Sequence, residues 1–340
     1  MKTRSTLLLS RLPALALLLA VFLAGCGKKE DPAKVLRVGF FPNITHAQAI
    51  IAQQMEAEGK SWYAPRMPAG VTLRWLPFNA GPTAMESLLI ESIDVSYVGP
   101  NPALNAYVRR GGKDIRQLTG SATGGSALVA QPELALSPVP QAADFKGKKI
   151  GTPQYGNTQD VACRVWLVKG GLKVHKTGGE AAIVPMQNPE LVQLFGQKDI
   201  DAAWTVEPWV SRLVAKGGKI VPVKRDFPDI TTLIATCERT LQTQPVLVRA
   251  FVKAHGELTD WMNKNPDAAL GYLHRGLERL TGTKLDAKLV ASAFKNITFT
   301  TKVDRASMRA FVDDAFSIGM FETKEKPDLV NFFHEENTEK

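Results

Sequence analysis

Short apolar runs alternate with tight polar turns and helical segments along the first third of the chain. Each apolar run is rich in β-branched and aromatic residues, as in a strand, and each following segment carries apolar residues at helical spacing. The pattern predicts three strand–turn–helix units, with strands at 35–40, 71–77 and 94–98 and helices at 47–58, 83–90 and 101–109. Such alternation is typical of a parallel sheet covered by helices, a doubly wound α/β fold.

The same alternation returns later in the chain. Strands are predicted at 115–119 and 127–130, separated by the glycine- and serine-rich segment 120–126. A second α/β run contains a helix at 158–169 and strand-like segments at 182–184, 202–204, 219–223 and 231–236, and beyond Pro245 the pattern is mostly helical. We therefore expect two lobes, 35–124 with 230–335 and an inserted 125–229. A cleft should lie between them at the carboxyl ends of the parallel strands.

The first 26 residues have the layout of an export signal. Lys2, Arg4 and Arg11 form a basic head, and the apolar run 12–23 is shorter than the ~20 residues of a membrane-spanning helix. The run ends in Leu-Ala-Gly-Cys26, which resembles the bacterial lipobox. We expect a lipoprotein signal peptide at 1–25 and acyl chains on Cys26; an ordinary signal beside a cysteine is the alternative. The polar segment 26–34 is expected to tether the protein to the periplasmic side of a bacterial membrane.

Charge and cysteine content narrow the class of partner. The formal charge of +9 falls to about +6 without the basic residues of the signal, an excess compatible with small anionic ligands. The basic residues are scattered and not interleaved with aromatic ones, so a nucleic-acid partner is not indicated. Cys163 and Cys237 lie in apolar segments, where two separate buried thiols are favoured over a disulfide. No Cys or His spacing predicts a metal site, and no cofactor motif is present.

Four strand-to-helix turns are candidates for ligand binding, because backbone N–H groups at a helix start favour oxyanions. Their polar residues are Asn43, Thr45 and His46 in the first turn, Thr83 in the second, Asn101 in the third, and Gln154, Asn157 and Thr158 in the fourth. Taken singly, each residue is explained as well by helix capping. Together, four such turns on the cleft side of two lobes favour a ligand site.

His46 also allows a catalytic interpretation, in which Asp160 or Glu207 would be its acid–base partner. No nucleophile stands in a recognisable spacing to it, and the phosphate-loop, nucleophile-elbow and zinc-protease motifs are absent from the sequence. A role as hydrogen-bond donor to an anion is therefore favoured. Trp204, Glu207 and Trp209 follow a predicted strand and are read equally well as core or as a wall of the cleft.

The sequence resembles the solute-binding proteins of ABC importers, in the group that binds sulfonates, nitrate and taurine. The likeness extends from about residue 36 to 331 and is carried by VGFFPNITHA at 38–47, FNAGPTA at 78–84, DVSYVGPNP at 94–102, DFKGKKIG at 144–151, GNTQD at 156–160 and WTVEPW at 204–209. It implies a type II periplasmic-binding-protein fold, with two doubly wound α/β lobes joined by two hinge crossings. It also implies a monomer that delivers a small anionic or zwitterionic solute to an ABC permease with its ATPase.

Mapped onto this chain, the resemblance implies a set of polar ligand contacts from both lobes. They are Asn43, Thr45, His46, Thr83, Asn101, Ser121, Thr123, Gln154, Asn157, Thr158 and Glu207. A sulfonate- or taurine-like anion is the leading solute; nitrate, an aromatic acid, a pyrimidine precursor or a sensory role are alternatives. The turn at 43–46 differs from the small-residue turn usual in sulfonate binders, which disfavours a simple alkyl sulfonate.

Overall fold

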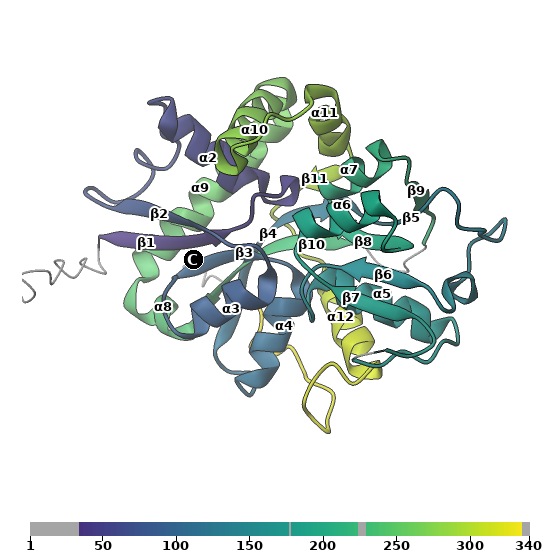
Figure 1. Cartoon of the computed structure of the whole chain (residues 1–340). Helices are drawn as coiled ribbons and strands as arrows, with labels where there is room; N and C mark the ends of the chain where they lie inside the picture. The colour runs from purple at the N-terminus through teal and green to yellow at the C-terminus, as the bar shows by residue number, and fades with distance from the viewer. Residues whose placement is uncertain (1–33, 177, 224–228, 335–340) are drawn as a thin grey trace, which may run out of the picture.

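The apolar runs form two separate sheets in the computed structural model, which describes residues 34–176, 178–223 and 229–334 (Figure 1). Within these residues, the first sheet has six strands in the order β11-β4-β10-β3-β1-β2. They are β1 (Val35–Phe40), β2 (Thr72–Pro77), β3 (Val95–Val98), β4 (Ile115–Gly124), β10 (Ile230–Cys237) and β11 (Ile297–Phe299). Strands β1, β2 and β3 are parallel, whereas β10 is antiparallel to β3 and β4.

Helices cover both faces of the first sheet, each with its own core. One face carries α2 (Ala47–Ala57), α9 (Pro245–Lys264), α10 (Pro266–Thr281) and α11 (Ala287–Lys295). The other face carries α3 (Gly81–Leu89), α4 (Pro100–Arg109) and α12 (Arg305–Ser317). The short α8 (Glu238–Thr243) leads from β10 into α9. The apolar residues buried between these helices and the sheet hold the first lobe together.

The second sheet is smaller and is wound in the same way. Among the described residues its five strands follow the order β7-β6-β8-β5-β9. They are β5 (Ser126–Ala130), β6 (Lys149–Thr152), β7 (Ala182–Pro185), β8 (Ala202–Val206) and β9 (Lys219–Val221). One face packs against α5 (Thr158–Lys169) and the short helix η2 (Ala142–Phe145), the other against α6 (Asn188–Gln197) and α7 (Trp209–Ala215).

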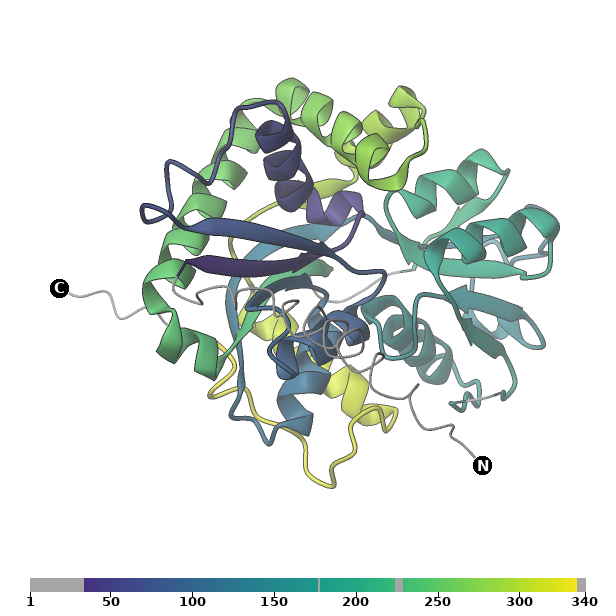
Figure 2. The same ribbon diagram turned by 60° about the vertical axis from the view of Figure 1, so that its left-hand side comes forward.

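The chain joins the two lobes at two places in its sequence, and Figure 2 shows the lobes from a second direction. The first passage is at Gly124 and Gly125, whose φ angles of +77° and +72° favour glycine. A Cβ atom at Gly124 would lie 2.7 Å from the carbonyl oxygen of Asn296, so a larger residue would clash there. The chain returns between β9 and β10. The predicted two-lobe, doubly wound α/β fold is confirmed.

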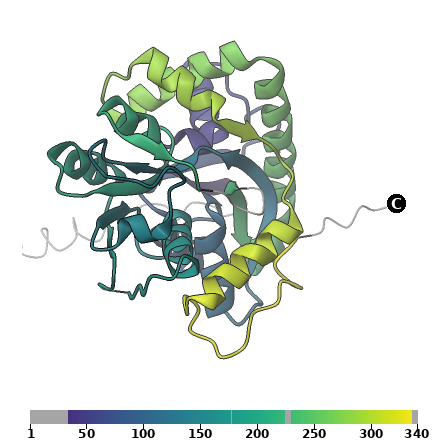
Figure 3. The same cartoon turned by 90° about the vertical axis from the view of Figure 1, so that its right-hand side faces the viewer.

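The predicted helices and strands are largely present, with one correction. The strand predicted at 115–119 is longer than expected, because β4 continues through Gly124 and pairs with β10 and β11 along this part. The elements α7, α8 and β11 were not predicted. Figure 3 shows α12 next to the second lobe, where Lys169 of α5 forms a 2.6 Å ion pair with Asp314.

Cys163 and Cys237 are free thiols buried in different cores, as predicted. Burial raises the pKa of both thiols, that of Cys237 to about 12, so neither is a reactive thiolate. The predicted signal peptide and tether fall on residues 1–34, of which 1–33 lie outside the described residues. Within the described part, no helix is long and apolar enough to cross a membrane.

Candidate functional site

Two adjoining cavities lie where the lobes meet. The smaller one, here called the inner cavity, measures about 20 Å³, and the larger one, the vestibule, measures about 690 Å³. The inner cavity is lined by Phe41, Asn43, Thr45, His46, Asn79, Gly99, Pro153, Asn157, Thr158, Gln159, Asn188, Val206 and Thr231. Asn79, Pro153 and Asn188 also line the vestibule, so the two spaces are neighbours.

The strand–turn–helix pattern brings these residues together. The short helix η1 (Ile44–His46) follows β1, Gly99 caps α4 after β3, and Asn157 caps α5 after β6. Asn188 opens α6 after β7. Since the carboxyl ends of parallel strands meet at one edge of a sheet, turns from both sheets face each other across the cleft.

His46 is held as a neutral hydrogen-bond donor. Its Nδ1 accepts the backbone N–H of Phe41 at 3.3 Å, which places the ring proton on Nε2. Burial lowers the pKa of His46 to about 3, so the ring carries no charge at neutral pH. No described residue accepts a hydrogen bond from Nε2, and His46 lines the inner cavity. The Nε2–H group is therefore available to a ligand.

Two asparagines are oriented in the same way. Trp209 donates its Nε1–H to Asn43 Oδ1 at 2.8 Å, and Thr205 donates its hydroxyl to Asn188 Oδ1 at 2.6 Å. Because an indole can only donate, it fixes which end of the Asn43 amide faces Trp209. Both amide NH₂ groups are left without an acceptor among the described residues. The cavity wall thus holds several N–H donors in fixed orientations.

The inner cavity has no charged side chain among its described lining residues. The neighbouring Asp160 is buried but fully engaged: Arg164 pairs with it at 3.0 Å, and Thr152 and the N–H of Gly156 donate to it. An anion in this cavity would be bound by neutral donors and helix N-termini rather than by a counter-ion.

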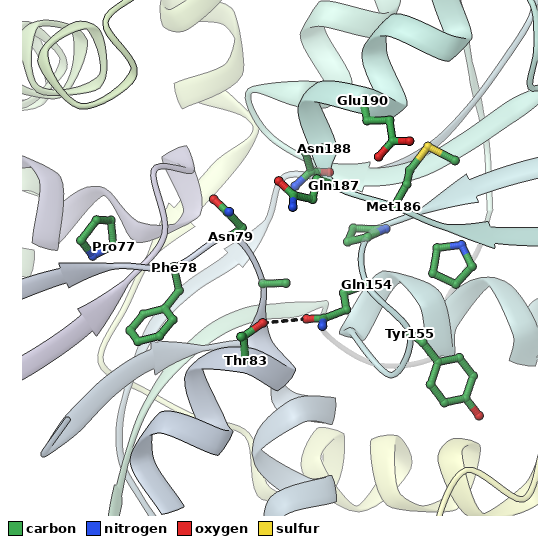
Figure 4. Close-up of a pocket in the computed structure, with 13 residues that line it drawn as sticks. Pro77, Phe78, Asn79, Thr83, Gln154, Tyr155, Met186, Gln187, Asn188 and Glu190 are labelled. Carbon is green, nitrogen blue, oxygen red and sulfur yellow. Dashed lines mark hydrogen bonds between the residues drawn. The ribbon is translucent and has the colours of Figure 1, made fainter. Parts of the chain in front are cut away.

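Direct contacts hold the lobes together around the cavities. The N–H of Ile44 donates to the carbonyl of Glu207 at 3.1 Å, and that of Asn101 donates to Thr158 Oγ1 at 3.4 Å. A Cβ atom at Gly99 would lie 2.4 Å from Thr158 Oγ1, so glycine permits this close approach. At the vestibule, Thr83 donates to Gln154 Oε1 at 2.9 Å (Figure 4).

The predicted contact residues separate into three groups. Five line the inner cavity, namely Asn43, Thr45, His46, Asn157 and Thr158. Two line the vestibule, Thr83 and Gln154. Four line neither cavity, namely Asn101, Ser121, Thr123 and Glu207.

Glu207, Ser121 and Thr123 are engaged within the fold. The Glu207 carboxylate accepts hydrogen bonds from the backbone N–H and the hydroxyl of Ser211, each at 3.0 Å, and from the side-chain amide of Asn296 at 2.9 Å. Burial raises the pKa of this carboxyl group. Ser121 donates to Gln48 Oε1, and Thr123 lies in β4 between β10 and β11. These three residues link elements of the structure rather than line a cavity.

Asn101 and the two tryptophans have distinct surroundings. The Asn101 side chain is buried, and neither polar atom of its amide has a hydrogen-bond partner among the described residues. Trp204 packs in the core of the second lobe against Trp166, whereas Trp209 supports Asn43 at the inner cavity. The sequence left open whether Trp204 and Trp209 belong to the core or to the cleft. Trp204 lies in the core, and Trp209 lies next to the cleft.

The acid–base pairs of the catalytic interpretation are not formed. Asp160 is paired with Arg164, and Glu207 is bonded to Ser211 and Asn296. Among the described residues, the ring of His46 forms a hydrogen bond with the backbone N–H of Phe41 and with no carboxylate. In the described ranges, no three side chains are grouped so that they could hold a metal ion.

Sequence reasoning missed four polar residues of the inner cavity, which are Asn79, Gln159, Asn188 and Thr231. Asn79 lies two residues after the end of β2 and Asn188 opens α6, so both carry the strand-to-helix signal used for the other turns. Gln159 stands beside the predicted Thr158. Thr231 lies in β10, where a strand pattern gives no sign of a ligand contact.

Similarity to known proteins agrees with this architecture. The sequence model of the NMT1-like family matches residues 29–271, more than half of the chain. The "Putative aliphatic sulfonates-binding protein" of Bacillus subtilis (strain 168) is 26% identical over 286 residues, covering 81% of this chain and 79% of that protein.

Two solved structures share the fold. The alkanesulfonate-binding protein SsuA from Xanthomonas axonopodis pv. citri, bound to MOPS, has a TM-score of 0.69 at 18% identity, covering 88% of this chain and 97% of that one. The periplasmic nitrate-binding protein NrtA from Synechocystis PCC 6803 has a TM-score of 0.70 at 14% identity, covering 86% and 83%. The family resemblance seen in the sequence is confirmed, and the chain belongs to the NMT1-like family.

Proposed function

We propose that this protein is an extracytoplasmic solute-binding protein that captures a small organic anion, sulfonate- or taurine-like, between its lobes and delivers it to an ABC permease. The observation that carries the proposal is the inner cavity, where His46, Asn43 and Asn188 each have one polar group fixed by the fold and an N–H left over. Buried donors without acceptors are costly unless a ligand or water accepts from them. A binding role is also supported by the names of the similar proteins.

The solute would be captured by closure of the two lobes around it. We assign 35–124 and 230–335 to the first lobe and 125–229 to the second, which is supported by the break between β4 and β5 at Gly124 and Gly125. A solute that contacts both lobes at once stabilises the closed arrangement over an open one. Neither buried carboxylate near the site faces His46, which supports binding without catalysis.

Lipid attachment at Cys26 is the part of the proposal that rests on sequence alone. Acyl chains there would hold the protein at the periplasmic face of the membrane, beside a permease. Mass spectrometry of the protein purified from membranes should show an N-terminal cysteine carrying acyl chains, and Cys26→Ser should release the protein into the soluble fraction. An unmodified Cys26 in membrane-extracted protein would refute the anchor.

The binding proposal is tested by thermal unfolding of the protein with sulfonates, taurine, nitrate, sulfate, carboxylates and pyrimidines. A specific ligand at ~100 times its Kd stabilises the folded state by about 2.7 kcal/mol, which raises Tm by about 4 °C or more for a protein of this size. Asn157→Ala should abolish the shift, whereas Asn331→Ala, at an exposed asparagine outside both cavities, should leave it unchanged. If no compound in the panel shifts Tm, the proposed solute class is wrong.

A further inference from the structure

The two cavities differ in chemistry, and the difference describes a solute with two ends. We propose that the solute has a compact hydrogen-bond-accepting head for the inner cavity and an extended apolar body for the vestibule, ending in an amine or another hydrogen-bond donor beside Glu190. The inference rests on the proposed function and specifies its substrate class. It distinguishes this chain from a receptor for nitrate, sulfate or a dianion.

The head follows from the inner cavity. Its oriented groups are the Nε2–H of His46 and the NH₂ groups of Asn43 and Asn188, which are all donors. In this conformation the cavity has room for about one water molecule, so a head with several oxygen atoms needs the lobes slightly further apart. Neutral donors suit a singly charged or polar acceptor group, and no described lining cation is present to balance a higher charge.

The body follows from the size and walls of the vestibule. At about 690 Å³ it falls within the range of cavities that bind organic molecules, and it is far larger than an inorganic oxyanion needs. Phe78 from the first lobe and Tyr155 and Met186 from the second line the vestibule together with three prolines, and Figure 4 shows Phe78 on one side of the view and the other two on the opposite side. A solute confined to the inner cavity would leave these apolar faces in contact with water, whereas an apolar body would cover them.

The charge of the vestibule lining indicates which group the far end of the solute carries. Glu190 is the charged residue among the described residues that line the vestibule, and no lysine or arginine accompanies it. Its side chain is exposed at the first turn of α6, and Figure 4 shows it near Met186. A carboxylate at this position attracts an amine and repels a second acid. The lining therefore favours a zwitterion over a dianion.

Calorimetric titration of the wild-type protein with four sulfonates separates these features. The compounds are ethanesulfonate, pentanesulfonate, ω-aminopentanesulfonate and pentane-α,ω-disulfonate, with the matching carboxylates as a second series. Each methylene buried in the vestibule should strengthen binding by about two- to fourfold. The amine should bind about two- to fivefold more tightly than the unsubstituted chain, and the disulfonate more weakly than either.

Variants then assign the far end to one residue. Glu190→Gln should remove the preference for the amine and leave pentanesulfonate binding within about twofold. Asp267→Asn is the matched control, because it removes a carboxylate from the first turn of α10, which lies outside both cavities. It should change no affinity ratio, so an altered amine preference in Glu190→Gln is specific to the carboxylate at the vestibule and not to the loss of one negative charge from the protein.

The outcomes distinguish this inference from the proposed function. If ethanesulfonate binds as tightly as pentanesulfonate, or the disulfonate binds tightest, the two-ended solute is refuted while anion binding stands. An unchanged amine preference in Glu190→Gln refutes the role of Glu190. If neither series binds at all, the proposed function itself fails.

Discussion

Two buried histidines in the first lobe, His46 and His255, differ in how their ring nitrogens are hydrogen-bonded. His46 in η1 is 2% exposed and His255 in α9 is fully buried. Desolvation lowers the pKa of both rings, to about 3 for His46 and to about 4 for His255, so both are neutral. Their ring nitrogens differ in how they are satisfied.

His255 has a partner on each side. Its Nε2–H donates to the carbonyl of Gly120 at 2.9 Å, and its Nδ1 accepts from the hydroxyl of Tyr97 at 3.0 Å. His46 has one such partner, the N–H of Phe41, which donates to Nδ1. Its Nε2 has no described partner, and the residue lines the inner cavity. Burial and a shifted pKa are thus common to both, and the N–H donor without an acceptor is what makes His46, but not His255, a candidate for ligand binding.

The comparison is tested most strongly at His255. Replacing His255 with Leu keeps an apolar volume but leaves the Tyr97 hydroxyl and the Gly120 carbonyl unpaired in the core. We expect the free energy of unfolding, measured by urea denaturation, to fall by about 2–4 kcal/mol. His274→Leu is the control, because it removes a hydrogen bond from a partly exposed imidazole to the carbonyl of Leu285. This variant should lower the free energy of unfolding by less than about 1 kcal/mol. Equal losses in the two variants would contradict a special role for the buried bonds.

The counterpart is His46→Phe, which keeps a ring packed 4.3 Å from that of Phe41 but removes the Nε2–H donor. A hydrogen bond to a charged group contributes about 1.5–3 kcal/mol, so affinity for the best anion should fall roughly 10- to 100-fold. Stability should fall less than in His255→Leu, because only the N–H of Phe41 loses its acceptor. Unchanged affinity, measured by calorimetry, would show that His46 does not contact the solute.

Local pattern predicted the elements of the fold and the turns of the site, because both depend on residues close in sequence. The local pattern did not predict the order of the strands in the sheet. Strand β10 lies between β3 and β4, although more than a hundred residues separate β10 from either strand in the sequence. The family resemblance implied Glu207 as a ligand contact, whereas its place after β8 left core and cleft equally open. Its carboxylate is instead taken by Ser211 and by Asn296, a partner 89 positions away.

The same limit applies to charge states. The turn predicted His46 as a binding residue, but its neutral form depends on burial by the assembled lobes and on Phe41. Asn188, by contrast, could have been found, since it opens a helix after a strand as Asn157 does. Sequence reasoning was therefore most accurate where capping and binding use the same local geometry.

Stability should depend on pH through both histidines. Their pKa values lie near 6.5 in the unfolded chain and at about 3 and 4 in the folded one, so unfolding takes up protons below pH 6.5. The free energy of unfolding should fall by roughly 2–4 kcal/mol from pH 7 to pH 5. The raised pKa of Glu207 acts in the opposite direction and reduces this loss. His255→Leu should lose about half of the histidine contribution, and a curve parallel to wild type would contradict the neutral state of His255.

The smallest effect concerns how the donors at the inner cavity are held. Trp209→Phe keeps an aromatic ring but removes the indole N–H that orients the amide of Asn43. The amide is then free to rotate, and we expect affinity for the anion to fall about three- to tenfold. Trp204→Phe is a matched control in the same lobe, because that indole donates to Ser126 in the core and lines neither cavity. A loss of affinity only in Trp209→Phe would show that a residue outside the cavity sets the direction of a donor within it, and equal affinities in both variants would show that the amide of Asn43 needs no such support.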